Sequence, residues 1–295
     1  MNSSYSITLP TNPLIRASFW MAGTLSAFTL MAIAGRELSS DLNTFQILFF
    51  RSAISLAIIS LWLSITGWHV IKSDQLMVHG LRNFTHFLGQ YGWFYGIGLI
   101  PLAEVFAIEF TVPLWTAIIA AMMLKEKINP GRSVAIVVGI AGVIVMLRPG
   151  IEIINPASIA VLAGAVCYAF AHTLTKKLSG HDSPLSIIFY MSLMQLPLGL
   201  IPSLLDWQTP SGMMWVWLLI VAACALVAHY CLAQALSLAD ATIVVPMDFL
   251  RLPLIALIGF LLYEEMIDWF VFAGACLMVS GNLVNLRYEQ RLREN

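Results

Sequence analysis

The chain of 295 residues is 59% hydrophobic and only 11% charged, whereas soluble proteins carry about 45–50% apolar and about 25% charged residues. A soluble fold of this length could not bury so much apolar surface, so the mean hydropathy of +0.85 indicates that lipid is the solvent. The net charge of −1 gives no reason to expect a nucleic-acid partner.

Ten apolar segments follow one another along the chain. A helix that spans a bilayer needs about 20 mostly apolar residues, and candidates lie near 14–35, 44–65, 80–99, 102–124, 133–148, 156–175, 185–205, 214–236, 241–262 and 269–286. The fifth candidate is short and the third is relatively polar. Because only short links separate them, the sequence predicts an all-α integral membrane protein with ten transmembrane helices.

The positive charges predict the orientation of these helices. Eleven of the 15 Lys and Arg residues fall in links on the N-terminal side of the membrane, namely Arg16, Lys72, Arg82, Lys125, Lys127, Arg132, Lys176, Lys177, Arg287, Arg291 and Arg293. The links on the other side hold only Arg36 and Arg148. Basic residues accumulate in cytoplasmic links, so both termini are expected in the cytoplasm, with the chain in a bacterial inner membrane.

An internal repeat relates the two halves. The segment RELSSD at 36–41 is similar to KKLSGH at 176–181, and later Glu109-Phe110 corresponds to Asp248-Phe249 at an offset of 139. Each half holds five spans, an odd number, so the second half must be inverted relative to the first. The sequence therefore predicts two inverted five-helix repeats, at 14–148 and 156–286. Inverted repeats are typical of secondary transporters, whose halves move about a central site.

The repeated positions carry a resemblance to a known family. The first copy is Pro101-Leu102-Ala103-Glu104, Pro113, Leu124-Lys125-Glu126, Gly139 and Gly142, and the second is Ala239-Asp240-Ala241, Pro246, Tyr263-Glu264-Glu265 and Gly281. This pattern resembles that of EamA-type carriers of the drug/metabolite transporter superfamily. The family usually has Gly before the last Glu of each copy, where this chain has Lys125 and Glu264.

Two further segments narrow the resemblance. Phe49-Phe50-Arg51-Ser52 and Gly80-Leu81-Arg82-Asn83 are similar to the branch that contains S-adenosylmethionine and riboflavin carriers. The resemblance implies a ten-helix basket and proton- or exchange-linked movement of a metabolite in either direction. It does not choose the cargo, because one fold serves many functions.

Four charged residues, Arg51, Glu109, Asp248 and Arg251, lie inside predicted spans and well away from the span ends. A charge at the bilayer centre costs at least about 2.5–3.5 kcal/mol, so such residues are usually paired and often functional. The two acids are related by the repeat, and they could bind a cationic group or take up a proton. Equally, Asp248 could pair with Arg251, three residues away on one helix face, while Arg51 neutralises Glu109. Both interpretations stay open.

Prolines, histidines and aromatic residues give further candidates. Pro113, Pro246 and Pro253 fall in corresponding spans of the two halves, where broken helices often mark a transport site, although a tolerated kink is the simpler alternative. His86, His229 and Tyr91 are candidates for the cavity or for ordinary packing. Aromatic rings could stack on a ring of the solute or hold a sulfonium by cation–π attraction.

Other functional classes have less support. Four cysteines, Cys167, Cys224, Cys231 and Cys276, lie in apolar runs without metal-binding spacing, so neither a metal nor a cofactor is expected. No nucleotide-binding loop or catalytic motif indicates an enzyme, and no filter-like segment indicates a channel. The sequence predicts a carrier of a small polar or zwitterionic metabolite, such as riboflavin, S-adenosylmethionine or an amino-acid-like solute. Export, proton coupling and a homodimer are left open.

Overall fold

The computed structural model describes residues 13–124, 129–148, 155–239, 244, 247–266 and 268–294. Its main helices are α1 (Pro13–Leu38), α2 (Thr44–Thr66), α3 (Leu76–Leu99), α4 (Leu102–Glu109), α5 (Val112–Leu124), α6 (Pro130–Leu147), α7 (Pro156–Leu178), α8 (Pro184–Ser203), α9 (Met214–Leu238), α11 (Arg251–Tyr263) and α12 (Trp269–Glu294). Two short 3₁₀ turns, Trp68–Ile71 and Leu204–Asp206, follow α2 and α8. The predicted all-α class is confirmed, since the described residues contain no strand.

Polar caps fix where several of these helices begin. The side chains of Asn43, Asn129, Asn155 and Ser183 each accept a hydrogen bond from a backbone N–H in the first turn of α2, α6, α7 and α8. Proline is the first residue of α6, α7 and α8, a position where its missing N–H costs nothing. These signals explain why the links stay short.

Eight helical segments of the described chain are long and apolar enough to cross a membrane, so the protein is a multi-pass membrane protein. The segment Leu102–Met123 counts as one of the eight although it is broken between α4 and α5. Helix α3 falls outside the eight because its buried face carries His79, Arg82, Asn83, His86 and Gln90, and α11 has only 13 residues. The count of ten transmembrane helices therefore stays a prediction.

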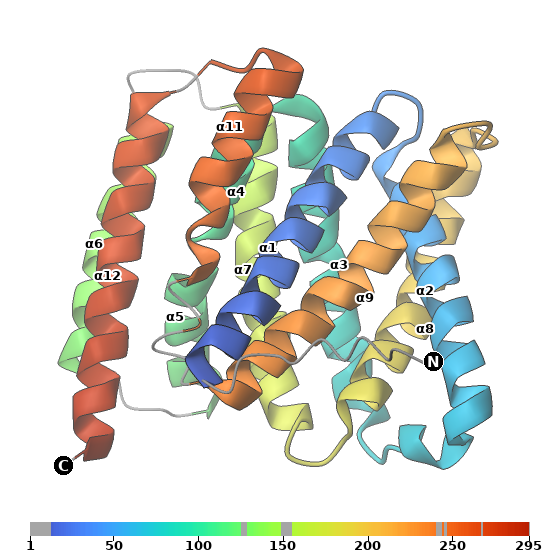
Figure 1. Ribbon diagram of the computed structural model, residues 1–295, viewed down its shortest axis with the longest axis horizontal. Helices are drawn as coiled ribbons and strands as arrows, with labels where there is room; N and C mark the ends of the chain where they lie inside the picture. The colour runs from blue at the N-terminus through green and yellow to red at the C-terminus, as the bar shows by residue number, and fades with distance from the viewer. Residues whose placement is uncertain are drawn as a thin grey trace, which may run out of the picture.

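The helices pack mainly in pairs (Figure 1). The most extensive contacts join α1 to α9, α3 to α7, α2 to α8, and α6 to α12. Glycines let two of these pairs approach closely. A Cβ on Gly142 would lie 2.7 Å from the backbone oxygen of Gly274, and a Cβ on Gly164 would lie 3.0 Å from that of Gly89. Small residues at such crossings allow the helix–helix packing that holds membrane bundles together.

The bundle has two chemically different ends. The end at which α1 begins and α12 ends, the lower end in Figure 1, is called the basic end here. By the helix bounds this end carries Arg16, Lys72, Arg132, Lys176 and Arg287. The other end, called the opposite end, carries Arg36 and Arg148. Both of these arginines are in ion pairs, with Glu265 and Asp268 respectively.

Candidate functional site

A cavity of about 590 Å³ lies among the helices, a size typical of sites for small organic ligands. Its walls come from both halves of the chain, from α1 to α7, α9, α11 and α12. The lining includes Glu109 and Asp248 at the breaks in two helices, and Arg132, Lys176 and Asn285 near the basic end. The cavity therefore extends from the middle of the bundle toward the basic end.

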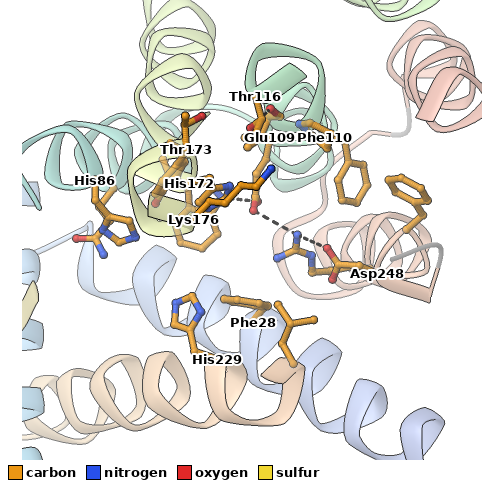
Figure 2. A pocket seen from close by; sticks show the side chains of 18 of the residues that line it. Phe28, His86, Glu109, Phe110, Thr116, His172, Thr173, Lys176, His229 and Asp248 are labelled. Atoms are coloured by element: carbon orange, nitrogen blue, oxygen red, sulfur yellow. Dashed lines mark hydrogen bonds and ion pairs between the residues drawn. The ribbon is translucent and has the colours of Figure 1, made fainter. Parts of the chain in front are cut away.

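An ion cluster forms the charged centre of this cavity (Figure 2). The Arg251 Nη2 donates to Glu109 Oε1 at 3.2 Å and to Asp248 Oδ2 at 3.0 Å. The second Glu109 oxygen accepts from the indole N–H of Trp93 at 2.8 Å. With both acids ionised, the cluster carries one negative charge in excess. The predicted pair of Asp248 with Arg251 is confirmed, whereas the suggested pairing of Arg51 with Glu109 is wrong, because Arg251 takes that place.

Aromatic rings surround the cation of this cluster. The guanidinium carbon of Arg251 lies 4.8 Å from the ring centre of Phe28, 5.0 Å from that of Phe106 and 5.7 Å from that of Phe110. Rings at these distances attract a cation electrostatically and keep water from it. Only 4% of the Arg251 side chain is exposed, so its position depends on the two carboxylates and on these rings.

Helix breaks place both acids at the cavity wall. Helix α4 ends at Glu109 and α5 begins at Val112, with Pro113 as its second residue. Asp248 precedes α11, which begins at Arg251 and has Pro253 in its first turn. Proline suits a first turn because no helical partner exists there for its missing N–H. Pro113 and Pro253 thus lie next to the two acids, while Pro246 lies outside the described residues.

Three histidines, His86, His172 and His229, line the cavity from α3, α7 and α9. The Tyr168 ring lies between two of them, 5.3 Å from His86 and 6.3 Å from His172 between ring centres. His86 Nδ1 is 3.1 Å from the amide nitrogen of Gln195. Within the described ranges, no group of three or more His, Cys, Asp or Glu side chains is arranged to hold a metal ion.

Tyr91 lies away from this cavity. Its ring is 4.6 Å from Phe45 and 5.9 Å from Tyr95, and all three line a second cavity of about 380 Å³ at the opposite end. Phe94, which is 2% exposed, lines both cavities and so lies between them. As a candidate for the central cavity, Tyr91 is replaced by Trp93, two residues further along α3.

Sequence reasoning missed the position of Arg82. The distribution of positive charges predicts Arg82 in a link, but α3 begins at Leu76 and buries Arg82 to 7% exposure. Its Nε donates to Thr175 Oγ1 at 3.0 Å and its Nη1 donates to Asn83 Oδ1 at 2.8 Å. The signal in the sequence was the polar stripe of α3, in which polar residues recur every three or four positions. The role of Trp93 as a donor to Glu109 had no such signal.

Comparison with known proteins agrees with this architecture. The chain matches the EamA-like transporter family twice, over residues 15–148 and 155–287. It is 27% identical over 272 residues to the S-adenosylmethionine uptake transporter of Rickettsia prowazekii, with 92% of each chain covered. It is 30% identical over 271 residues to the riboflavin transporter of Vibrio cholerae, covering 90% of this chain and 91% of that one.

More distant similarities extend the comparison. The chain is 26% identical over 260 residues to a pseudopaline exporter of Pseudomonas aeruginosa, covering 85% of this chain and 89% of the exporter. A crystal structure superposes with a TM-score of 0.65 at 17% identity, covering 94% of this chain and 98% of the other, which shows a shared fold. Together with the relatives, the double match identifies a metabolite transporter and not an enzyme: the chain belongs to the EamA-like transporter family.

Proposed function

We propose that this protein imports a small, charged, ring-bearing metabolite of the S-adenosylmethionine kind across the bacterial inner membrane by alternating access. The observation that carries this proposal is the Glu109–Arg251–Asp248 cluster in a cavity that both halves of the chain line. A cationic group of the solute can compete with Arg251 for the two carboxylates. The rings of Phe28 and Phe110, which line the cavity, suit a sulfonium or an adenine ring.

The pattern of helix contacts supports two inverted repeats of five helices, at 14–148 and 156–286. Under the repeat, α1 corresponds to α7 and α3 corresponds to α9. The contact of α1 with α9 then corresponds to the contact of α7 with α3, and both are extensive. The repeat also relates α2 to α8 and α6 to α12, so each of these two contacts joins a helix to its own counterpart in the other half. Such symmetry is what two similar halves related by an axis in the membrane plane would produce.

The direction of opening supports a state open to the cytoplasm. Basic residues favour the cytoplasmic side, so we assign the basic end to the cytoplasm, together with both termini. The central cavity extends toward that end. At the opposite end Glu265 accepts hydrogen bonds from the Arg36 guanidinium and from the backbone N–H of Leu102. Import requires these contacts to open while the basic end closes.

Riboflavin is the second candidate, because the Vibrio cholerae relative is named a riboflavin transporter and the cavity is lined by several aromatic side chains. S-adenosylmethionine is favoured because the cavity also holds Glu109, Asp248 and Arg251, three charged residues that contact one another. An uncharged solute would displace water from these groups without compensating their charges.

Counterflow into proteoliposomes tests the proposal. Purified protein should exchange labelled S-adenosylmethionine against the unlabelled compound with saturation, and riboflavin should compete weakly or not at all. The variant Glu109→Gln should lose most of this exchange while its thermal unfolding stays cooperative, because a glutamine oxygen still accepts from Trp93. Glu104→Gln is the matched control, since Glu104 lies on the same helix and accepts from Ser158 outside the cavity lining.

Each possible result of these exchange measurements leads to a different conclusion about the cargo or about Glu109. Exchange of riboflavin but not of S-adenosylmethionine would replace the favoured cargo by the second candidate. Undiminished exchange in Glu109→Gln would reduce Glu109 to a structural residue. Dependence of uptake on an imposed pH gradient would add protons as the coupling ion, with the two carboxylates as the sites that bind them.

A further inference from the structure

Arg51 is a buried cation that faces the central cavity. It lies on α2, its exposed fraction is 5%, and it contributes to the cavity lining. Its Nε is buried and makes no hydrogen bond, and no hydrogen bond or ion pair connects its guanidinium to another described residue. A charge removed from water without a partner is strongly destabilising. Such a group therefore calls for a partner that enters the cavity.

The other two buried arginines of the cavity region have their partners. Arg251 is held by Glu109 and Asp248, and Arg82 donates to Thr175 and Asn83. Among these three, and within the described residues, only Arg51 makes neither a hydrogen bond nor an ion pair. Its difference from Arg82 is informative, because both are buried in the bundle and only Arg82 has hydrogen-bond acceptors within the fold.

Among the residues that the structure describes, the ionisable groups near Arg51 carry no negative charge. They come from three neighbouring helices and comprise Arg82 and His86 of α3, Tyr168 of α7 and His229 of α9. The acids of the cavity, Glu109 and Asp248, are both committed to Arg251. The cavity is therefore polarised, with excess negative charge at the ion cluster and excess positive charge at Arg51.

We propose that Arg51 binds the carboxylate of the transported solute, so that the protein selects zwitterionic substrates of the amino-acid type over their decarboxylated counterparts. The inference rests on the proposed function and adds the chemical group that the solute must carry. A guanidinium presents two parallel N–H donors to a carboxylate, and His86 and Tyr168 supply further donors in the same wall. The cationic part of the same solute then faces Glu109 and Asp248.

The test compares S-adenosylmethionine with decarboxylated S-adenosylmethionine in counterflow. Wild type should favour the carboxylated compound by about 10- to 100-fold, the range expected for one charge-assisted interaction. Arg51→Gln should lose this preference by weakening exchange of the carboxylated compound alone. Its melting temperature without solute should not fall, because the substitution removes an unpaired buried charge.

Arg82→Gln is the matched control. It removes a guanidinium from the same region that is already hydrogen-bonded, so its melting temperature should fall while the preference for the carboxylated compound remains. A preference that persists in Arg51→Gln would overturn the proposal.

Failure of the proposed function can be told apart from failure of this inference. If wild type exchanges neither compound, the proposed cargo is wrong. The role of Arg51 is then tested by measuring how small ligands change the melting temperature. L-Methionine, but not its decarboxylated amine, should raise the melting temperature of wild type and leave that of Arg51→Gln unchanged. Equal effects of the acid and the amine on wild type would overturn the assignment of a carboxylate site.

Discussion

Arg36 and Glu265 join the end of α1 to the link between α11 and α12, with Arg36 Nη2 at 2.6 Å from Glu265 Oε1. The same arginine donates to the carbonyl oxygen of Ile100, and the second Glu265 oxygen accepts from the N–H of Leu102. One ion pair thus ties three separate segments together at the opposite end. These contacts, here called the Arg36 latch, close that end in the structure.

Breaking the Arg36 latch should open the opposite end. Arg36→Gln removes the cation and leaves the Glu265 carboxylate without its ion-pair partner, which should shift the equilibrium toward opening by about 1–2 kcal/mol, or roughly tenfold. The measurement is labelling of a cysteine at Gln90, a cavity residue, by an impermeant maleimide added outside cells, in a background without the native cysteines. Arg287→Gln, the same change at the basic end, should leave the labelling rate unchanged. Equal labelling in all three proteins would show that the latch does not control access.

The Arg36 latch should also respond to pH. Burial raises the pKa of Glu265, while the N–H of Leu102 and the Arg36 guanidinium lower it in part. When the end opens, Glu265 becomes hydrated and its pKa returns toward 4.5. The closed form therefore binds the proton more tightly than the open form. This extra stability of the closed form is fully present below about pH 4.5 and is lost as the pH rises through the raised pKa of Glu265. Cysteine labelling from outside should be slower in acid. In Arg36→Gln the pH midpoint of this change in labelling rate should move to higher pH, because the guanidinium no longer lowers the pKa of Glu265. A rate that is independent of pH after correction for thiol ionisation would contradict this.

Phe94 should act as the barrier between the two cavities. It is almost fully buried and lines both of them, so Phe94→Ala should connect them. We expect a leak of small solutes from proteoliposomes and weaker coupling of exchange. The control is Phe87→Ala on the same helix, which is also buried but lines neither cavity. Both variants should lose about 3–5 kcal/mol of stability, so only the leak distinguishes them, and its absence in Phe94→Ala would remove the barrier role.

The close contact between α3 and α7 should leave no space for a larger residue in place of Gly92. A Cβ there would collide with the backbone oxygen of Ala160, and backbone cannot give way as a flexible side chain can. Gly92→Ala should therefore lower the melting temperature, by the equivalent of about 1–3 kcal/mol. Gly80 lies on the same helix with nothing within 4 Å of such a Cβ, so Gly80→Ala should be neutral or stabilising by up to about 1 kcal/mol. Equal melting temperatures for the two variants would contradict the observed crossing.

The central charged residues were visible in the sequence, but their partners were not. Asp248 and Arg251 are three residues apart, and the helical repeat alone predicts their contact. Glu109 and Arg251 are 142 positions apart, and nothing local distinguishes Arg251 from Arg51 as the neutralising cation. The choice depends on how α2, α4 and α11 are placed and rotated in the bundle, and that placement leaves Arg51 free for a solute.

Apolar runs, the positions of the basic residues and the repeated motif are properties of the sequence itself, because a bilayer selects segments by length and hydropathy. They were sufficient to predict an all-helical membrane carrier of this family. The tertiary structure alone decided which face of each helix meets the cavity. Tyr91 and Trp93 are two residues apart on α3, and successive helical residues are rotated by about 100°, so the two side chains point about 200° apart. Trp93 therefore reaches Glu109 while Tyr91 faces the second cavity, because the rotation of a helix within its bundle is set by packing against its neighbours.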